Sequence, residues 1–145
     1  MTKAGSAGSM VRTFRLLCVD DNELGLYVNA VILRSEGYDV LACSDVSKAT
    51  AVAEKEEIDL AILDYQMPAM NGAELAAFCK AVNPDVKVIL FSGSLCIPKR
   101  ELALADLFVP KSEGIIALLK GIEALLPRAG MPASFASTSS TATSA

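Results

Sequence analysis

Acidic, hydroxyl and basic side chains stand at the ends of four apolar runs in this chain of 145 residues. Asp20 and Asp21 follow the first of these runs, Asp64 follows a later one, Ser92 follows the next and Lys111 follows the last. Taken singly, an acid before a turn usually only shapes the turn or caps a helix, and a lone lysine or serine is usually a surface residue. The succession of acid, hydroxyl and cation at the ends of separate runs instead indicates one shared site.

Carboxylates gathered in one site would need a cation between them. Crowded carboxylates repel one another and raise one another's pKa unless a positive charge offsets them. Mg²⁺ prefers six oxygen ligands and typically takes carboxylates, a carbonyl, waters and a phosphate oxygen. We therefore expect Mg²⁺ as the cofactor of this site.

With the metal in place, an aspartate oxygen could attack a phosphoryl group and form an acyl phosphate. Lys111 would then pair with the phosphoryl oxygens as a point charge, and Ser92 would donate a hydrogen bond to another oxygen. Positioning and electrostatics would supply most of the catalysis.

The elements that must position these residues alternate between strands and helices. Strands are expected at 14–19, 38–42, 60–63, 86–91 and 107–109, and helices at 23–36, 46–57, 73–81, 99–105 and 115–126. Near-continuous apolar strands separated by helices are typical of a parallel sheet covered on both faces. The pattern predicts a doubly wound α/β domain, whose ligands bind beyond the carboxyl ends of the strands. The polar residues at the run ends would then converge in one cavity.

Length and composition limit the class of protein. We expect a single domain at 13–127, between a flexible leader at 1–12 and a disordered Ser/Thr/Ala-rich tail at 128–145. No apolar run reaches the roughly 20 residues that span a bilayer, and the leader lacks the apolar segment of a secretory signal. We therefore expect a cytoplasmic protein without membrane insertion.

Charge and residue usage exclude further classes. A net charge of −4 without a basic stripe argues against direct nucleic-acid binding. The four cysteines are scattered without a C-x-x-C pair, which predicts reduced thiols, three of them in the core. The chain has no histidine, so a phosphohistidine donor would have to be another protein or segment.

Four motifs occur in a fixed order along the chain. They are Val19-Asp20-Asp21-Asn22, Leu63-Asp64-Tyr65-Gln66-Met67-Pro68, Phe91-Ser92-Gly93 and Phe108-Val109-Pro110-Lys111. Together they resemble the receiver domain of two-component response regulators, of the chemotaxis-regulator type, over residues 14–126. The resemblance implies a flavodoxin-like (βα)₅ fold with strand order 2-1-3-4-5.

The resemblance also implies roles for the metal-site residues. Asp64 would be the phosphoacceptor and a metal ligand, and Asp21 would bind Mg²⁺ directly. Asp20 would act mainly through a water, and Gln66 would add its backbone carbonyl. The Gln66 side chain should also lie near the entering water and influence the lifetime of the acyl phosphate.

A second group of roles concerns switching. Ser92 resembles the switch hydroxyl of the family, Phe108 the aromatic residue that rotates when the hydroxyl moves, and Lys111 the phosphate-pairing lysine. Phe108 lacks the hydroxyl of the tyrosine often found there, and Ser92 replaces the equally common threonine, so the coupling could be weaker or differently timed.

The residue after the lysine departs from the family pattern. The family usually has a proline there in a cis peptide, whereas this chain has Ser112. A cis bond without proline costs about 3–4 kcal/mol. Either Lys111–Ser112 is trans, with the lysine aimed differently, or the site holds a strained cis bond.

The implied function is that of a stand-alone receiver. It would take a phosphoryl group from a histidine kinase or a histidine phosphotransfer protein and signal to an unknown downstream protein target, with homodimerisation left open. It would assist its own phosphorylation and dephosphorylation without being an enzyme. One alternative is a pseudo-receiver, an interaction module without a phosphoryl cycle. Another is a small aspartate-nucleophile phosphatase, which Gln66 disfavours because those enzymes resemble a D-x-D arrangement.

The first predicted helix is apolar nearly all round. One face carries Leu26, Ala30 and Leu33, and another carries Leu24, Val28 and Val31. The second face could pack against the last helix, or it could be a kinase-docking surface, which the resemblance places near this helix.

Overall fold

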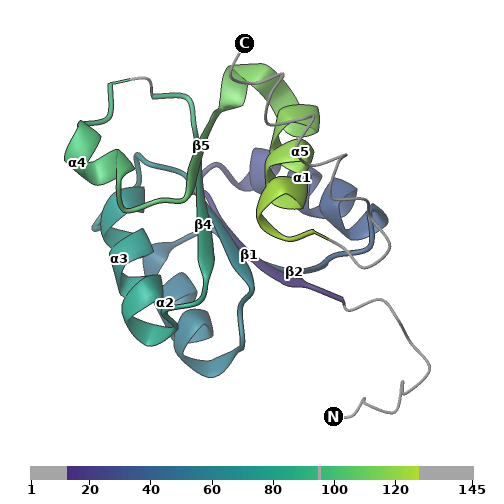
Figure 1. The fold of residues 1–145 in the computed structure, drawn as a ribbon, viewed down its shortest axis with the longest axis horizontal. Helices are drawn as coiled ribbons and strands as arrows, with labels where there is room; N and C mark the ends of the chain where they lie inside the picture. Colours follow the sequence, from purple (N-terminus) through teal and green to yellow (C-terminus); the bar gives the residue numbers. More distant parts are fainter. Residues whose placement is uncertain (1–12, 95, 128–145) are drawn as a thin grey trace.

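In the computed structural model, which describes residues 13–94 and 96–127, five parallel strands form one sheet in the order β2-β1-β3-β4-β5 (Figure 1). The strands are β1 (Arg15–Val19), β2 (Asp39–Cys43), β3 (Leu60–Leu63), β4 (Lys87–Ser92) and β5 (Leu107–Pro110). The helices are α1 (Glu23–Ser35), α2 (Val46–Lys55), α3 (Gly72–Val82), α4 (Lys99–Leu102) and α5 (Gly114–Leu125), with a short 3₁₀ helix η2 (Lys111–Glu113) before α5. The predicted fold class and strand order are confirmed. The predicted leader and tail lie outside the described residues.

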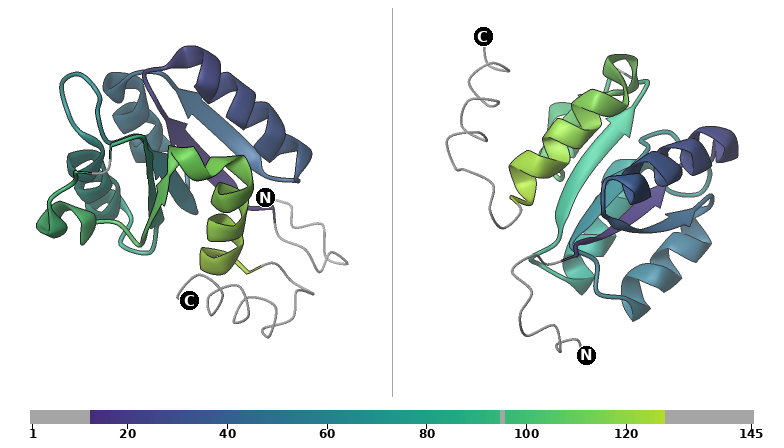
Figure 2. Two further views of the ribbon diagram at one scale, coloured as in Figure 1. Left: turned by 90° about the horizontal axis from the view of Figure 1, so that it is seen from above. Right: turned by 90° about the vertical axis from the view of Figure 1, so that its right-hand side faces the viewer.

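Two helical layers enclose the sheet. Helices α1 and α5 lie on one face, and α2, α3 and α4 lie on the other (Figures 1 and 2). Residues of β1 alternate between the layers: Leu16 and Cys18 belong to the core under α1 and α5, whereas Leu17 and Val19 belong to the core under α2 and α3. Both faces of a strand are therefore buried, which explains why its sequence is apolar without alternation. None of the described helices has the length and apolar character required to cross a lipid bilayer.

Local capping residues set where the helices begin. The Asn22 side chain accepts a hydrogen bond from the Gly25 N–H at 3.2 Å and caps α1. Helix α3 begins with a capping box, in which Asn71 and Glu74 each bond to the backbone of the other. Helix α1 therefore begins just after Asp20 and Asp21 in the chain, and α3 begins after the loop that follows Asp64.

The prediction of a helix over 99–105 is too long, because α4 ends at Leu102. Beyond it, the N–H groups of Leu104 and Ala105 bond to carbonyls only three residues earlier, at 3.0 and 3.1 Å. The chain tightens there because the next N–H, that of Asp106, joins the sheet through the Val88 carbonyl at 2.8 Å. The other predicted element ends differ from the structure by at most two residues.

The cysteines behave as predicted. Cys18, Cys43 and Cys79 are buried, Cys96 is exposed, and all four are free thiols. Burial raises the pKa of Cys18 to about 12 and that of Cys79 to about 11, so both stay protonated.

Gly72 fixes the turn between Asp64 and α3. Its N–H donates to the Tyr65 carbonyl at 2.8 Å. A Cβ atom at this position would lie 2.3 Å from the Asp64 carbonyl oxygen and 2.9 Å from Leu90 Cδ2. Only glycine lets the helix start come this close to the acidic strand end.

We predict that Gly72→Ala lowers the free energy of unfolding by about 1–3 kcal/mol, because the backbone of β3 or the start of α3 must move. Urea unfolding followed by circular dichroism measures the change. Gly93→Ala is the matched control, since a Cβ there meets nothing within 4 Å. Equal stabilities of the two variants would contradict this explanation.

Asp106 ties α3 to the edge of the sheet. Its Oδ2 accepts hydrogen bonds from Lys80 Nζ at 2.9 Å and from the Val88 N–H at 2.8 Å. Burial acts to raise the pKa of Asp106, but these hydrogen bonds and the charge of Lys80 outweigh it and hold the pKa below its ordinary value. The ionised carboxylate therefore stabilises the fold.

We predict that Asp106→Asn costs about 0.5–1.5 kcal/mol of stability near pH 7. Because the folded pKa of Asp106 is lowered, this contribution is present above about pH 4 and is lost as the pH falls through the folded pKa. Urea unfolding at a series of pH values should show the two proteins converging in acid, while Asp85→Asn, at an exposed acid, leaves the profile unchanged. A difference that persists at the lowest pH would contradict the assignment.

Candidate functional site

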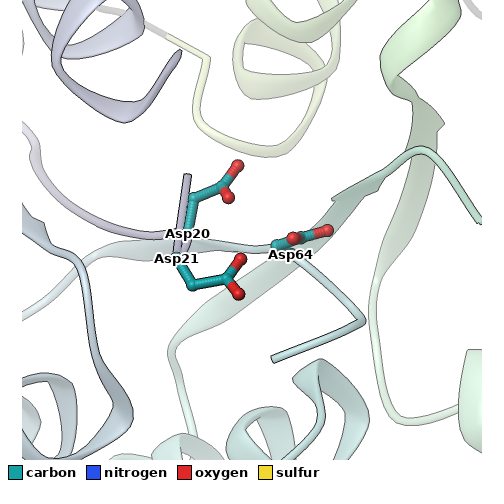
Figure 3. Close-up of side chains that lie close together, drawn as sticks. All are labelled: Asp20, Asp21 and Asp64. Atoms are coloured by element: carbon teal, nitrogen blue, oxygen red, sulfur yellow. The ribbon is translucent and has the colours of Figure 1, made fainter. Parts of the chain in front are cut away.

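Three aspartates gather at the carboxyl ends of β1 and β3. Each of Asp20, Asp21 and Asp64 offers one carboxylate oxygen such that these oxygens all lie within 4.8 Å of one another, and Figure 3 shows the side chains close together. The register pairs Val19 with Leu63, and the Asp64 N–H donates to the Val19 carbonyl at 3.0 Å. Neighbouring parallel strands thus bring together acids that are far apart in sequence, as predicted.

The three acids differ in exposure. Asp20 and Asp64 are buried, whereas Asp21 is exposed. One oxygen of Asp20 accepts the Asn22 N–H at 2.9 Å, which helps to fix the position of that carboxylate. Asp21 therefore presents the most accessible carboxylate, and Asp20 the most firmly held.

Lys111 reaches this cluster from the end of β5. Its Nζ lies 2.6 Å from Asp20 Oδ2 and 3.7 Å from Asp64 Oδ2. All peptide bonds of the described residues are trans, including the one between Lys111 and Ser112. Of the two alternatives left by the sequence, the structure has the trans bond, and the lysine bonds to Asp20 rather than to Asp64.

Burial and charge make Asp64 unusual. Burial, followed by the charge of Asp20, raises its pKa, and the Lys111 charge, the Ser92 hydroxyl and the Tyr65 N–H offset only part of this increase. The ionised form of Asp64 is therefore held at some cost, which a cation could reduce. The metal-binding atoms gathered here are all carboxylate oxygens, which are hard ligands. Three ionised carboxylates and one lysine ammonium together carry a net negative charge. This set fits a hard divalent cation such as Mg²⁺.

Ser92 and Phe108 occupy different positions relative to the acids. Ser92 is 1% exposed, its hydroxyl acts to lower the pKa of Asp64, and its oxygen accepts the Ser94 N–H at 3.2 Å. Phe108 is half-buried, lies opposite Leu90 in the sheet, and packs against the core under α2 and α3. Ser92 therefore belongs to the cluster, and Phe108 lies one strand to its side.

Gln66 lies in the exposed loop after Asp64. Its neighbour Tyr65 anchors that loop through the carbonyl that accepts the Gly72 N–H. The roles predicted for the Gln66 carbonyl and side chain stay predictions.

Two features of the site were not predicted from the sequence. The first is the choice of Asp20 as the partner of Lys111. The second is a hydrogen bond from the Tyr65 hydroxyl to the Glu101 carboxylate on α4. The sequence shows a tyrosine directly after Asp64, but no pattern in the sequence links Tyr65 to Glu101, which lies 36 residues later.

Comparison with known proteins agrees with this architecture. A family profile described as the response regulator receiver domain matches residues 16–123. The probable transcriptional regulatory protein TcrX of Mycobacterium tuberculosis is 29% identical over 119 residues, which are 80% of this chain and 51% of TcrX. The chain thus spans about half the length of this relative, and 19% of the transcriptional regulatory protein GlrR of Escherichia coli, which is 35% identical over 57% of the chain.

Solved structures show the same fold. The response regulator TrrA of Thermotoga maritima in complex with Mg²⁺ and BeF is 28% identical, with a TM-score of 0.74, and the match covers 79% of this chain and all (100%) of TrrA. A complex of TrrA with the histidine kinase ThkA contains a chain that is 29% identical, with a TM-score of 0.72, over 79% of this chain and 99% of the other.

The fold and the cluster of acids at the strand ends define a receiver domain. The chain belongs to the response regulator receiver domain family.

The raised pKa of Asp64 predicts that Asp64→Asn stabilises the metal-free protein at pH 7. An acid whose folded pKa is raised loses stability as the pH rises through its unfolded pKa, about 3.9, toward the folded value. The gain should therefore vanish in acid and shrink when Mg²⁺ is added at pH 7, as measured by urea unfolding. A less stable Asp64→Asn protein at pH 7 would contradict this description of the site.

Proposed function

We propose that this chain is a Mg²⁺-dependent phosphoacceptor in which Asp64 takes a phosphoryl group from a histidine kinase or a histidine phosphotransfer protein. The observation that carries the proposal is the grouping of Asp64 with two further aspartates, a lysine ammonium and a serine hydroxyl. Each of these groups has a use in phosphoryl transfer to a carboxylate.

The transfer requires one bond to form and one to break. An Asp64 oxygen attacks phosphorus, the bond between phosphorus and the donor's ring nitrogen breaks, and that nitrogen keeps the electron pair. Mg²⁺ held by Asp21, Asp64, the Gln66 carbonyl and, through water, Asp20 would offset the charge of the carboxylates and the phosphoryl oxygens.

The protein's own groups then hold the product. Lys111 Nζ is 3.7 Å from Asp64 Oδ2, so a small movement away from Asp20 brings the ammonium to a phosphoryl oxygen. The Ser92 hydroxyl already acts to lower the pKa of Asp64 and can donate to a second phosphoryl oxygen. Movement of Ser92 would let Phe108 turn inward and shift the domain toward its signalling conformation.

The donor must come from outside this sequence, because the chain has no histidine. The exposed face of α1 supports a docking role. Leu24 is 77% exposed, Val28 49% and Val31 63%, so the alternative that the last helix covers this face is wrong. The ThkA–TrrA complex shows that a related receiver binds a histidine kinase. We infer that these three side chains contact the kinase or phosphotransfer protein.

The chain would act as a cytoplasmic signalling protein rather than an enzyme. Phosphorylated protein would contact a downstream protein target, and homodimerisation would be one way to present the switched surface.

The pseudo-receiver is the second candidate. The observation in its favour is the bond from Lys111 to Asp20, which leaves the lysine farther from Asp64. A phosphatase is less consistent with the site, because Gln66 occupies the position of the second acid and is exposed.

Acetyl phosphate and Mg²⁺ should add the mass of one phosphoryl group to the purified protein, as measured by intact mass spectrometry. We expect Asp64→Asn or chelation of Mg²⁺ to abolish the addition and Asp85→Asn, at an exposed acid, to leave it intact. An unmodified wild-type protein would favour the pseudo-receiver, and turnover of a phosphate ester would favour the phosphatase.

Gln66→Ala should change the rate at which the acyl phosphate decays by about two- to tenfold, the effect of one hydrogen bond near the entering water. The decay is followed by mass spectrometry after removal of acetyl phosphate. Glu54→Ala, at an exposed position on α2, serves as the control. A decay rate equal to that of the wild type would contradict the proposed effect of the Gln66 side chain on the lifetime of the acyl phosphate.

A further inference from the structure

A side-chain hydrogen bond joins the residue after Asp64 to helix α4. The Tyr65 hydroxyl donates to the Glu101 carboxylate. The Tyr65 ring also packs against the core under α2 and α3, which Leu102 and Ala105 contact as well. The end of β3 and α4 are therefore connected by both a polar and an apolar contact.

Helix α4 has little else to hold it. It is one turn long, has no side-chain hydrogen bond at its N-cap, and contains no buried residue. A single turn is not stable by itself in water, because forming the first turn costs more conformational entropy than one hydrogen bond returns. Elements with few buried contacts open at low free energy. The Tyr65–Glu101 bond should therefore contribute a large share of the stability of α4.

The backbone of Tyr65 also supports the acid site. Tyr65 directly follows Asp64 in the chain, and its carbonyl accepts the Gly72 N–H at 2.8 Å. One residue thus contacts the phosphoacceptor through its backbone and α4 through its side chain. Tyr65 therefore connects the Glu101 contact to a change at Asp64.

A second connection runs through Ser92. This buried side chain acts to lower the pKa of Asp64, and Ser92 ends the strand that precedes α4 in the chain. Helix α4 is thus preceded in the chain by a strand that ends at the acid site, and Glu101 joins the helix to the residue after Asp64.

We propose that the Tyr65–Glu101 hydrogen bond is a latch that stabilises the unphosphorylated position of α4 and is released when Asp64 is phosphorylated. This proposal rests on the proposed function. A phosphoryl group adds negative charge beside Tyr65, which disfavours the nearby Glu101 carboxylate, and it draws the Ser92 hydroxyl toward a new acceptor. Both effects move α4 away from Tyr65.

The latch has a reciprocal consequence. Because the bond stabilises one of two states, removing it must shift the equilibrium toward the other state and raise the affinity of that state's ligand. Loss of one hydrogen bond predicts an increase of about three- to tenfold in the affinity for Mg²⁺ and beryllofluoride, which together replace the phosphoryl group. The same loss should speed amide exchange at Leu102 and Ala103, whose N–H groups bond to Pro98 and Lys99.

The experiment measures beryllofluoride binding at saturating Mg²⁺ and amide exchange without either ligand, in the full chain. The variants are Tyr65→Phe, Glu101→Ala and the double variant, with Glu54→Ala on α2 as the control. Glu101 is the more decisive position, because Tyr65 also adjoins the acid site. We expect each single variant to bind beryllofluoride about three- to tenfold more tightly and to exchange faster in α4. The double variant should match the single variants, since both substitutions remove the same bond.

Unchanged or weaker beryllofluoride binding by Glu101→Ala, when the wild type binds, would overturn the latch and leave the proposed function standing. Unchanged exchange in α4 would overturn the claim that the bond holds the helix. A wild-type protein that binds no beryllofluoride would overturn the proposed function and the latch together.

Discussion

The parallel pairing of β1 with β3 is the constraint on which the rest of the site depends. The register places Val19 beside Leu63, and a backbone hydrogen bond of 3.0 Å holds Asp64 to Val19. Asp20 and Asp64 must then lie side by side in a largely buried position, whatever their charges. The fold thereby brings negative charge to a place where burial raises the pKa of Asp64. Lys111, arriving from β5, offsets this charge in part, and a divalent cation would offset the remainder.

The same constraint explains why the surrounding positions tolerate little change. The start of α3 must approach the Asp64 carbonyl so closely that only glycine fits at position 72. Ser92 is almost fully buried beside the acid. These residues affect both stability and the site, because the contacts that position the acids also complete the packing of the core at this end of the sheet. Helix α4 differs, since it is short and weakly held, and it is therefore the element best able to respond.

Much of this arrangement could be predicted from the sequence because it depends on local patterns. Apolar runs without alternation predict strands buried on both faces, and their order along the chain with helices between them predicts a parallel sheet. The convergence of Asp20, Asp64 and Lys111 follows from their position at the ends of such strands. These inferences depend on topology, which a short register shift does not alter.

The remaining features depend on differences that a sequence pattern does not encode. Lys111 Nζ lies 2.6 Å from Asp20 Oδ2 and 3.7 Å from Asp64 Oδ2. This difference depends on the local path of the chain after β5. Helix α4 ends early because Asp106 must enter the sheet. The bond between Tyr65 and Glu101 joins residues that no periodicity relates. The exposed face of α1 was left open by its sequence, because an apolar face can be covered by the same chain or by a partner.

We propose that Asp64 is the acid that carries the phosphoryl group. The most direct test phosphorylates the chain with a phosphorylated histidine kinase and Mg²⁺, reduces the acyl phosphate with borohydride, and locates the resulting homoserine by peptide sequencing with mass spectrometry. We expect homoserine at position 64 alone. Homoserine at position 20 or 21, or at none of the acids despite transfer to a known receiver in the same reaction, would contradict it.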